Sequence, residues 1–410
     1  MEENNLKLNI LYDEWDIYEN KPKITGEEIF DKNNLRNILN LMLFYEFNNI
    51  KSCSFNEINQ NENYFYFINH TNSINELLNN INSLSHPIFE KINITKNVYL
   101  VFLTEHETIN SNQFIILNKF CAANKLNTKQ IILINNNPLL EEYKKAFNSN
   151  IKVKKLNFLD KCTSLNLKKF DNEFKRIEDK EGKFFLCHNR VPKVHRYVIL
   201  MYLKKYNLLE NVDWSLILGK EFIKKYYNEK FYDILLTKQE LDEFSEVINY
   251  LNNIEIKKSD YEENKKWFDN SQLPWDEIFE LKTFENSYVN ITTESEYFSD
   301  SIHVTEKSLK PFYFHQLPII LASKNHVKFM KENYKLDFFD DIINHDYDNE
   351  RDPRKRIKKV ISEILRLQEN KSLIIQFYKN NTQRFLNNRK IIQNLNNKVD
   401  CDYFESLICI

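Results

Sequence analysis

Two groups of charged residues in this chain have the types and spacing of a site that binds a diphosphate. One is Thr-Glu-Lys at 305–307, which stands just before a proline and an apolar run. The other is the turn "NRVPKVHR", which holds Arg190, Lys193 and Arg196. Helix starts with cationic side chains bind oxyanions, because the first-turn N–H groups and the helix dipole favour negative charge. Both groups also have a plain interpretation, as a short capped helix and as a solvated basic turn.

Glycine content limits how the chain could hold phosphate. The sequence has 410 residues and only three glycines, Gly26, Gly182 and Gly219. Neither a dinucleotide-binding loop nor a P-loop can form, because each needs several glycines close together. A diphosphate would have to be held by helix N-termini and cationic side chains.

The elements that would position these residues form an α/β pattern. Short apolar runs typical of strands alternate with amphipathic segments typical of helices, which indicates parallel sheets. Ligands of open α/β sheets bind at the carboxyl ends of the strands. "FFLCHN" (184–189) and "SYVNITTES" (287–295) are predicted strands that end near the two charged groups. Thr305 is the expected N-cap of the helix that begins at 306.

Chain length and one polar stretch predict the domains. A single hydrophobic core rarely suffices for 410 residues. A charged stretch at 168–183 separates two α/β halves, and the pattern is helical from about 353. We predict an N-terminal acceptor-side α/β domain at 1–180 and a donor-binding α/β domain at 181–370. A helical segment at 371–410 would follow and could cross back to the first domain. Two Rossmann-like domains with a cleft between them are the expected fold.

Three stretches resemble the donor-binding signature of the α-1,3-fucosyltransferase-like glycosyltransferases, a family of GT-B architecture. They are "ITTES" (291–295), "HVTEK" (303–307) and "LPIIL" (317–321). The turn "NRVPKVHR" is similar to the Arg-bearing element that precedes this signature in the family. The resemblance extends over about 184–350. Two departures stand out: "TTES" replaces the family's "FENS", and His303 replaces an aromatic residue.

The resemblance implies an inverting glycosyltransferase that needs no metal or other cofactor. It would move a sugar from a nucleotide-sugar donor, with GDP-fucose as the leading expectation, to a hydroxyl of a glycan or glycoconjugate. Glu306 would bind ribose or sugar hydroxyls, Lys307 would bind the diphosphate, and Arg190 or Arg196 would complete the charge clamp. Fixed cations of this kind stabilise the departing diphosphate. The implied donor-binding residues are Arg190, Lys193, Arg196, Glu294, His303, Thr305, Glu306 and Lys307.

An inverting transfer also needs a general base near the acceptor hydroxyl. Glu105, His106 and Glu107 follow the predicted strand "VYLVFL" (98–103), and the two glutamates are the first candidates. His70 and the acidic residues at 13–16 are alternatives. Each of these side chains could equally be a solvated loop charge.

A rival signal is the D-x-D formed by Asp346 and Asp348, a pattern that ligates a divalent ion in metal-dependent glycosyltransferases. We favour a polar loop in which these aspartates cap a helix. A metal-dependent glycosyltransferase stays an alternative, as does a non-catalytic protein that binds carbohydrate or nucleotide.

Composition argues against several other classes. The formal net charge is -2, which lacks the electrostatic signature of a general nucleic-acid binder. Six cysteines include no C-x-x-C pair, so neither a zinc site nor a disulfide framework is expected. The polar N-terminus does not resemble a signal peptide, and no apolar run has transmembrane length. We therefore expect a cytoplasmic protein, and the richness in Asn, Lys and Ile is typical of an AT-rich genome.

Overall fold

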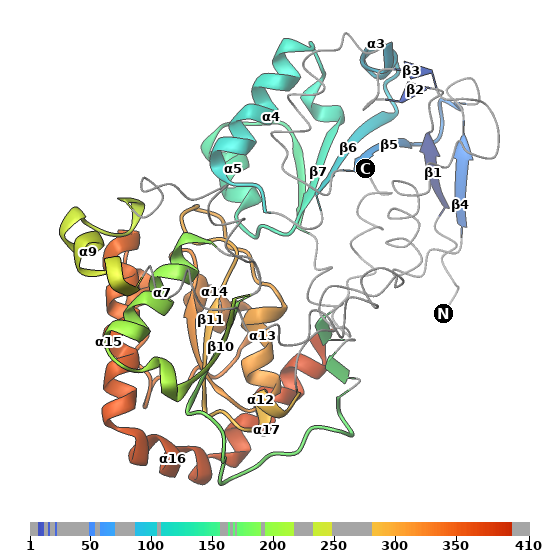
Figure 1. Ribbon diagram of the computed structural model, residues 1–410. Helices are drawn as coiled ribbons and strands as arrows, with labels where there is room; N and C mark the ends of the chain where they lie inside the picture. Colours follow the sequence, from blue (N-terminus) through green and yellow to red (C-terminus); the bar gives the residue numbers. More distant parts are fainter. Residues whose placement is uncertain are drawn as a thin grey trace. The chain divides into compact units, whose positions relative to one another are not determined.

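The chain forms two compact units, each with its own parallel sheet (Figure 1). Unit 1 comprises residues 1–158 and 399–410, unit 2 comprises residues 159–398, and each is described by itself. The computed structural model describes residues 7–11, 15–16, 21–22, 49–53, 58–69, 87–104, 108–155, 163–164, 167–168, 170–189, 193–216, 233–247 and 281–395.

The division between the units falls ahead of the polar stretch at 168–183, whereas the sequence places the boundary at 180. The described part of this stretch belongs to unit 2 because its side chains pack there. The Phe174 ring lies 5.4 Å from the Phe314 ring, and Arg176 donates to the carbonyl of Tyr378. The predicted return of the C-terminal segment to the first domain concerns residues after 395, which lie outside the described ranges.

Unit 1 is built on a six-stranded parallel sheet in the order β4-β1-β5-β6-β7-β8. Its strands are β1 (Lys7–Leu11), β4 (Asn49–Cys53), β5 (Tyr64–Asn69), β6 (Val98–Thr104), β7 (Ile131–Asn135) and β8 (Lys152–Lys155). The antiparallel pair β2 (Trp15–Asp16) and β3 (Lys21–Pro22) forms a separate sheet. The helices are α3 (Pro87–Ile94), α4 (Ser111–Ala123), α5 (Leu140–Ala146) and the 3-10 turn η2 (Thr128–Gln130).

The start of α4 shows how local sequence sets an element. Asn110 Oδ1 accepts from the Gln113 N–H, and Gln113 Oε1 accepts from the Asn110 N–H, both at 3.0 Å. This capping box satisfies two N–H groups that the first turn leaves open. Phe114 and Leu117 of the helix are then buried in the core together with Leu100 of β6.

Unit 2 is built on a four-stranded parallel sheet in the order β10-β9-β11-β12. Its strands are β9 (Phe185–Asn189), β10 (Val212–Leu216), β11 (Val289–Thr293) and β12 (Leu317–Leu321). Every residue of β11 and β12 is buried, as expected for a parallel sheet covered on both faces.

The helices of unit 2 lie on both sides of this sheet. In Figure 1, α7 and α15 stand on one side and α13 on the other; α15 contacts α7, and α17 contacts α13. They are α7 (Val194–Lys205), α9 (Lys238–Glu243), α12 (Leu281–Glu285), α13 (Glu306–Tyr313), α14 (His326–Tyr334), α15 (Pro353–Glu369), α16 (Lys371–Asn380) and α17 (Thr382–Gln393). The 3-10 turns η3 (Leu209–Asn211) and η5 (Asp346–Asn349) also belong to this unit. The predicted α/β class, with a parallel sheet in each Rossmann-like unit and helices at the C-terminal side, is confirmed.

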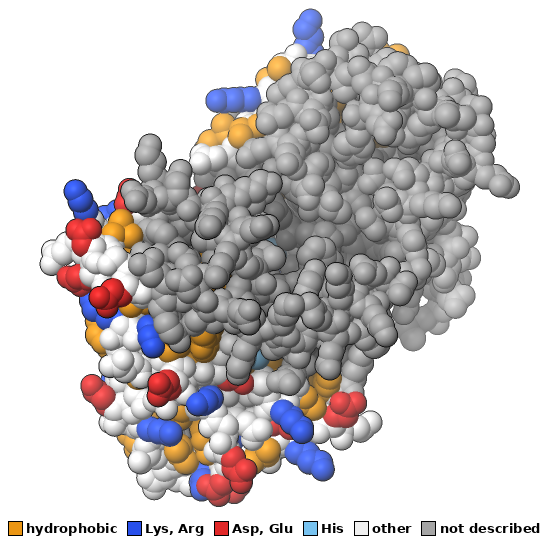
Figure 2. All heavy atoms as spheres, viewed as in Figure 1, with side chains coloured by type: hydrophobic (Ala, Val, Ile, Leu, Met, Phe, Trp, Pro, Cys, Tyr) orange, Lys and Arg blue, Asp and Glu red, His pale blue; other side chains and the backbone are white. Residues whose placement is uncertain are grey.

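The surface of unit 2 carries both signs of charge. Figure 2 shows acidic and basic side chains interspersed over its described part, in keeping with the net charge of -2. Among the described helices, none combines the length and the apolar character that crossing a bilayer requires.

Candidate functional site

The two predicted charged groups of unit 2 lie together at the carboxyl edge of its sheet. Neighbouring strands β9 and β11 end at Asn189 and Thr293, and the Thr293 hydroxyl donates to Asn189 Oδ1. Arg196 Nη2, from the first turn of α7, donates to the Thr293 carbonyl at 3.1 Å. Lys193 Nζ, just before α7, donates to the Ser295 carbonyl at 2.9 Å. The segments after β9 and β11 therefore meet, as the strand order requires.

Glu294 anchors the start of α13. Its side chain is fully buried, and Oε1 accepts from the Thr305 N–H at 3.1 Å and from the Ser308 hydroxyl at 2.5 Å. The Thr305 hydroxyl lies 2.8 Å from Oε2, which also accepts from the Ser295 N–H at 3.2 Å. A buried carboxylate needs such donors, because removal from water is otherwise costly. Glu294 thus fixes α13 instead of pointing into solvent.

The protonation state of Glu294 follows from this setting. Burial by itself raises the pKa of the carboxyl group, but the charge of Lys307 and the bond from Ser308 outweigh it, and the net pKa is lowered. Glu294 is therefore an anion at neutral pH, and its charge holds the two hydroxyl donors in place.

Thr305 is the N-cap of α13, as the sequence predicts. Its Oγ1 accepts from the Lys307 N–H at 3.2 Å. Glu306 and Lys307 then fall in the first turn, where Lys307 Nζ lies 2.7 Å from Glu306 Oε1. Although burial raises it, the pKa of Glu306 is lowered to about 2 by Lys307 and Lys310. The side chains of Glu306 and Lys307 keep 16% and 29% of their surface exposed, so both can reach a ligand.

His303 is buried just before the cap, and its Nε2 has no hydrogen-bond partner. Burial lowers the pKa of His303 despite the nearby charges of Glu294 and Glu296. The ring is therefore neutral at pH 7 and carries one unused polar atom next to the first turn of α13.

The N-terminus of α7 has the form of an anion site. No hydrogen bond from the side chain of its N-cap residue, Lys193, closes the helix, and the first turn contains no acidic residue. By contrast, Thr305 caps α13, and Asp348 occupies the first N–H groups of α14. Of these three helices at the carboxyl edge, α7 is thus the one for which the described residues supply no capping carboxylate or hydroxyl at its positive end.

His195 is a site residue that the sequence does not reveal. It is buried in the first turn of α7, and its Nε2 lies 2.9 Å from the Glu294 carbonyl. A carbonyl only accepts, so Nε2 carries the proton and Nδ1 is left as a buried acceptor without a partner. Burial, followed by the charge of Arg196, holds the pKa of His195 well below its usual range. The contact joins residues 99 positions apart, which sequence spacing cannot show.

A second contact that the sequence does not predict holds the Glu294 side chain in place. The Ser308 hydroxyl donates to Glu294 and lies 3.1 Å from His326 Nε2. Because the Ser308 hydroxyl donates its only hydrogen to Glu294, His326 Nε2 must be the donor to Ser308 Oγ. The chain Glu294–Ser308–His326 is fully buried, so it stabilises the site and does not act as a nucleophile.

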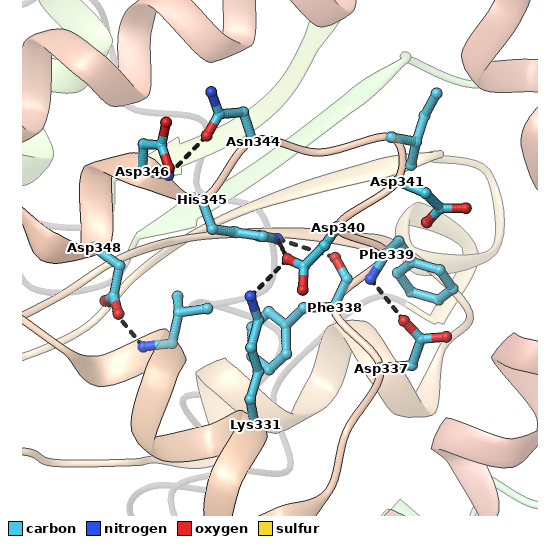
Figure 3. Close-up of polar contacts among 12 residues, drawn as sticks. Lys331, Asp337, Phe338, Phe339, Asp340, Asp341, Asn344, His345, Asp346 and Asp348 are labelled. Atoms are coloured by element: carbon cyan, nitrogen blue, oxygen red, sulfur yellow. Dashed lines mark hydrogen bonds and ion pairs between the residues drawn. The ribbon is translucent and has the colours of Figure 1, made fainter.

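The D-x-D residues have separate roles (Figure 3). Asp348 Oδ1 and Oδ2 accept from the N–H groups of Val327 and Lys328, both at 2.9 Å, so this carboxylate caps α14. Asp346 is exposed, and its N–H donates to Asn344 Oδ1 at 2.8 Å. The helix that Asp348 caps precedes it in the chain, whereas Asp352 caps the following helix, α15.

The loop around these aspartates also covers the free edge of β12. The Tyr347 hydroxyl accepts from the Ile320 N–H at 3.1 Å and lies 2.9 Å from His345 Nδ1. A pocket of about 650 Å³ opens beside the loop, and its walls include Lys331, Asp340 and His345 (Figure 3). Lys331 Nζ and Asp340 Oδ1 pair there at 2.6 Å. No group of three or more His, Cys, Asp or Glu residues within the described ranges could hold a metal ion.

Four of the main predicted site residues fall outside the described ranges, as do the alternative bases His70 and the acidic residues at 13–14. Arg190 directly follows β9, and Glu105, His106 and Glu107 directly follow β6. Both strands form where the sequence predicts them, so each group follows the carboxyl end of a parallel strand. Their roles stay predictions.

Comparisons with known proteins give distant likenesses. No protein-family model matches the sequence, and no curated protein matches it. The α,α-trehalose-phosphate synthase (UDP-forming) from Burkholderia vietnamiensis is similar at 8% identity and TM-score 0.37, over 90% of this chain and 77% of its own. The UDP-forming synthase from Burkholderia xenovorans shares 10% identity at TM-score 0.39, over 96% and 81%. The apo structure of OtsA shares 10% at 0.37, over 94% and 79%.

Proposed function

We propose that this chain is a glycosyltransferase whose unit 2 binds a nucleotide-sugar donor. The observation that carries the proposal is the uncapped N-terminus of α7 at the carboxyl edge of a parallel sheet, with Lys193 and Arg196 beside it. An uncapped helix start flanked by cations is suited to a diphosphate, and this edge is where open α/β sheets bind their ligands. We also propose that the chain has the GT-B architecture that the resemblance implies.

The site residues divide into two roles. Lys193 and Lys307 would hold the diphosphate, and Arg196, which is only 2% exposed, would stabilise its charge from within the protein as the glycosidic bond breaks. Glu306 would accept hydrogen bonds from ribose or sugar hydroxyls, and His303 would offer its unused Nε2 to the same ligand. Glu294 and Thr305 would position these residues through the contacts around the start of α13.

The reaction proposed is an inverting transfer to a hydroxyl of a glycan or glycoconjugate. Glu105 or Glu107 would take the proton of the acceptor hydroxyl, with His106 as the neighbouring alternative. GDP-fucose is the donor that the resemblance implies. In the metal-dependent alternative, Asp346 and Asp348 would hold the ion, but the backbone N–H groups of α14 already occupy both oxygens of Asp348.

Nucleotide binding tests the donor site directly. We expect one of GDP, UDP, dTDP and CMP to raise the melting temperature of the protein selectively, and GDP to be that nucleotide if the donor is GDP-fucose. Lys307→Ala should remove this stabilisation. Lys328→Ala is the matched control, because that lysine is 61% exposed on a nearby helix and lies outside the proposed site.

The outcomes separate the candidate functions. Selective stabilisation by UDP or dTDP would contradict the GDP assignment but keep the glycosyltransferase proposal. Stabilisation by none of the four would refute the donor site. Binding without hydrolysis or transfer of the matching nucleotide sugar, over a panel of glycan acceptors, would favour the non-catalytic binding protein. Loss of turnover in EDTA would favour the metal-dependent alternative.

A further inference from the structure

Arg356 is a buried arginine that the proposed reaction has not yet used. It lies in the first turns of α15, and only 4% of its surface is exposed. Its guanidinium donates to carbonyl oxygens alone: Nη1 reaches Ala322 at 2.7 Å and Tyr297 at 2.9 Å. Nε reaches Glu350 at 2.9 Å, and Nη2 reaches Arg351 at 3.4 Å. One side chain therefore ties together the end of β12, the segment after β11 and the entry to α15.

The charge of Arg356 has no direct counter-ion among the residues that the structure describes. None of the ion pairs within 4.0 Å among the described residues includes it, although Asp348, Glu350 and Asp352 act on it from further away. Burial lowers the pKa of Arg356, but a guanidinium starts so high that it stays charged at neutral pH. Carbonyl dipoles satisfy its N–H groups without cancelling its charge.

A column of two rings, those of Tyr297 and His195, connects the Arg356 guanidinium to the start of α7. The Tyr297 ring lies between the Arg356 guanidinium, 4.9 Å away, and the His195 imidazole, also 4.9 Å away and stacked at 23°. The Tyr297 hydroxyl donates to the Pro353 carbonyl at 2.5 Å, which fixes the ring. His195 in turn contacts the Glu294 carbonyl. The column thus joins α15 to both elements of the proposed donor site, the α7 N-terminus and the Glu294 anchor.

We infer that Arg356 is a positioning residue for the diphosphate of the donor, an inference that rests on the proposed function. It holds the segment after β11 against α7 through Tyr297 and adds a buried positive charge behind the phosphate-binding helix start. Both effects act on the phosphate groups of the ligand and leave its nucleoside untouched. Loss of Arg356 should therefore weaken binding of a nucleoside diphosphate more than binding of the nucleoside alone.

The experiment compares GDP with guanosine, and UDP with uridine, on the full chain by calorimetry. In Arg356→Gln we expect the affinity for the diphosphate to fall by about tenfold or more, and the affinity for the nucleoside to change by less than about twofold. Arg356→Lys keeps the charge and should lose less. Arg354→Gln is the matched control, because that arginine also donates to carbonyls, those of Asp233 and Ile234, but is only partly buried in the same turn.

The result distinguishes this inference from the proposed function. Equal losses for diphosphate and nucleoside, or no loss in either, would overturn the role of Arg356 while binding by the wild type still supports the donor site. Absence of diphosphate binding by the wild type would overturn both. If Arg356→Gln does not fold, Arg356→Lys and Tyr297→Leu are measured instead, and each must show the same preference for loss of diphosphate binding.

Discussion

Replacing Glu294 by glutamine tests whether a buried carboxylate holds α13 in place. The change keeps the size of the side chain but turns one acceptor oxygen into an NH₂ group. In the wild type, both oxygens face donors: the N–H groups of Ser295 and Thr305 and the hydroxyls of Thr305 and Ser308. Glutamine must therefore point its NH₂ at a donor, whichever way the amide is turned.

The magnitude follows from these contacts. A hydrogen bond to a charged group contributes about 1.5–3 kcal/mol, and a buried donor left without an acceptor costs about 1–3 kcal/mol. The hydroxyls can rotate to relieve part of the conflict, whereas the N–H groups cannot. We expect Glu294→Gln to lower the free energy of unfolding of unit 2 by about 2–4 kcal/mol.

The pH dependence gives an independent check. The pKa of Glu294 is lower in the folded protein than in the unfolded chain, so its contribution is fully present above the ordinary pKa of a glutamate, about 4.3. The contribution is lost as the pH falls through the lower, folded value. The stability gap between the wild type and Glu294→Gln should therefore be constant near pH 7 and narrow below about pH 4.

Urea denaturation followed by tryptophan fluorescence and circular dichroism measures the effect at pH 7 and at a series of pH values below 4. Glu296→Gln is the control, because Glu296 stands two positions away in the same segment and is partly exposed. A loss of less than about 0.5 kcal/mol in Glu294→Gln, or a loss equal to that of Glu296→Gln, would refute the anchoring role. A gap that does not narrow in acid would refute the charge-based explanation.

Three further outcomes are expected. Thr305→Ala removes the N-cap of α13 and should lower the free energy of unfolding by about 1–2 kcal/mol, whereas Thr305→Ser should retain most of it; urea denaturation measures both. Asp348→Ala uncaps α14 and should cost about 1–2 kcal/mol with no change in the response of activity to EDTA; an EDTA response lost together with Asp348 would support a metal site instead. Binding of GDP, or of whichever nucleotide binds, should weaken by about twofold to tenfold between 50 and 300 mM salt, because partly exposed cations such as Lys307 are screened; a salt-independent affinity would contradict a site built on cations.

The sheets and the helix caps could be predicted because they follow local rules. The predicted strand at 98–103 is a continuous apolar run, and the residues that start α13 form a standard cap signal. The parallel arrangement then brings the ends of β9 and β11 together, which places Lys193, Arg196 and Glu294 in one site. The order of the strands in the sheet brings these three residues together, which their spacing along the sequence does not show.

The rest of the site depends on contacts that no local pattern encodes. His195 reads as an ordinary residue of an amphipathic helix, and its role appears only when the Glu294 carbonyl lies beside it. Arg356 belongs to a long basic helix in which it looks like its exposed neighbours. Asp348 is a similar case. The usual N-cap pattern assigns an aspartate to the helix that follows it, whereas Asp348 caps α14, which precedes it in the sequence.

The order in which these contacts close along the chain bears on how the protein folds. The bonds from Glu294 to Thr305 and Ser308 span 11 and 14 positions, so the start of α13 can assemble as a short loop. The bonds from Arg196 and His195 to the same segment span 97 and 99 positions and must close a far larger loop at greater entropic cost. We expect the α13 anchor to form early in refolding and the α7 contacts to form late. The capacity to bind a diphosphate would then be among the last properties that the chain acquires on folding.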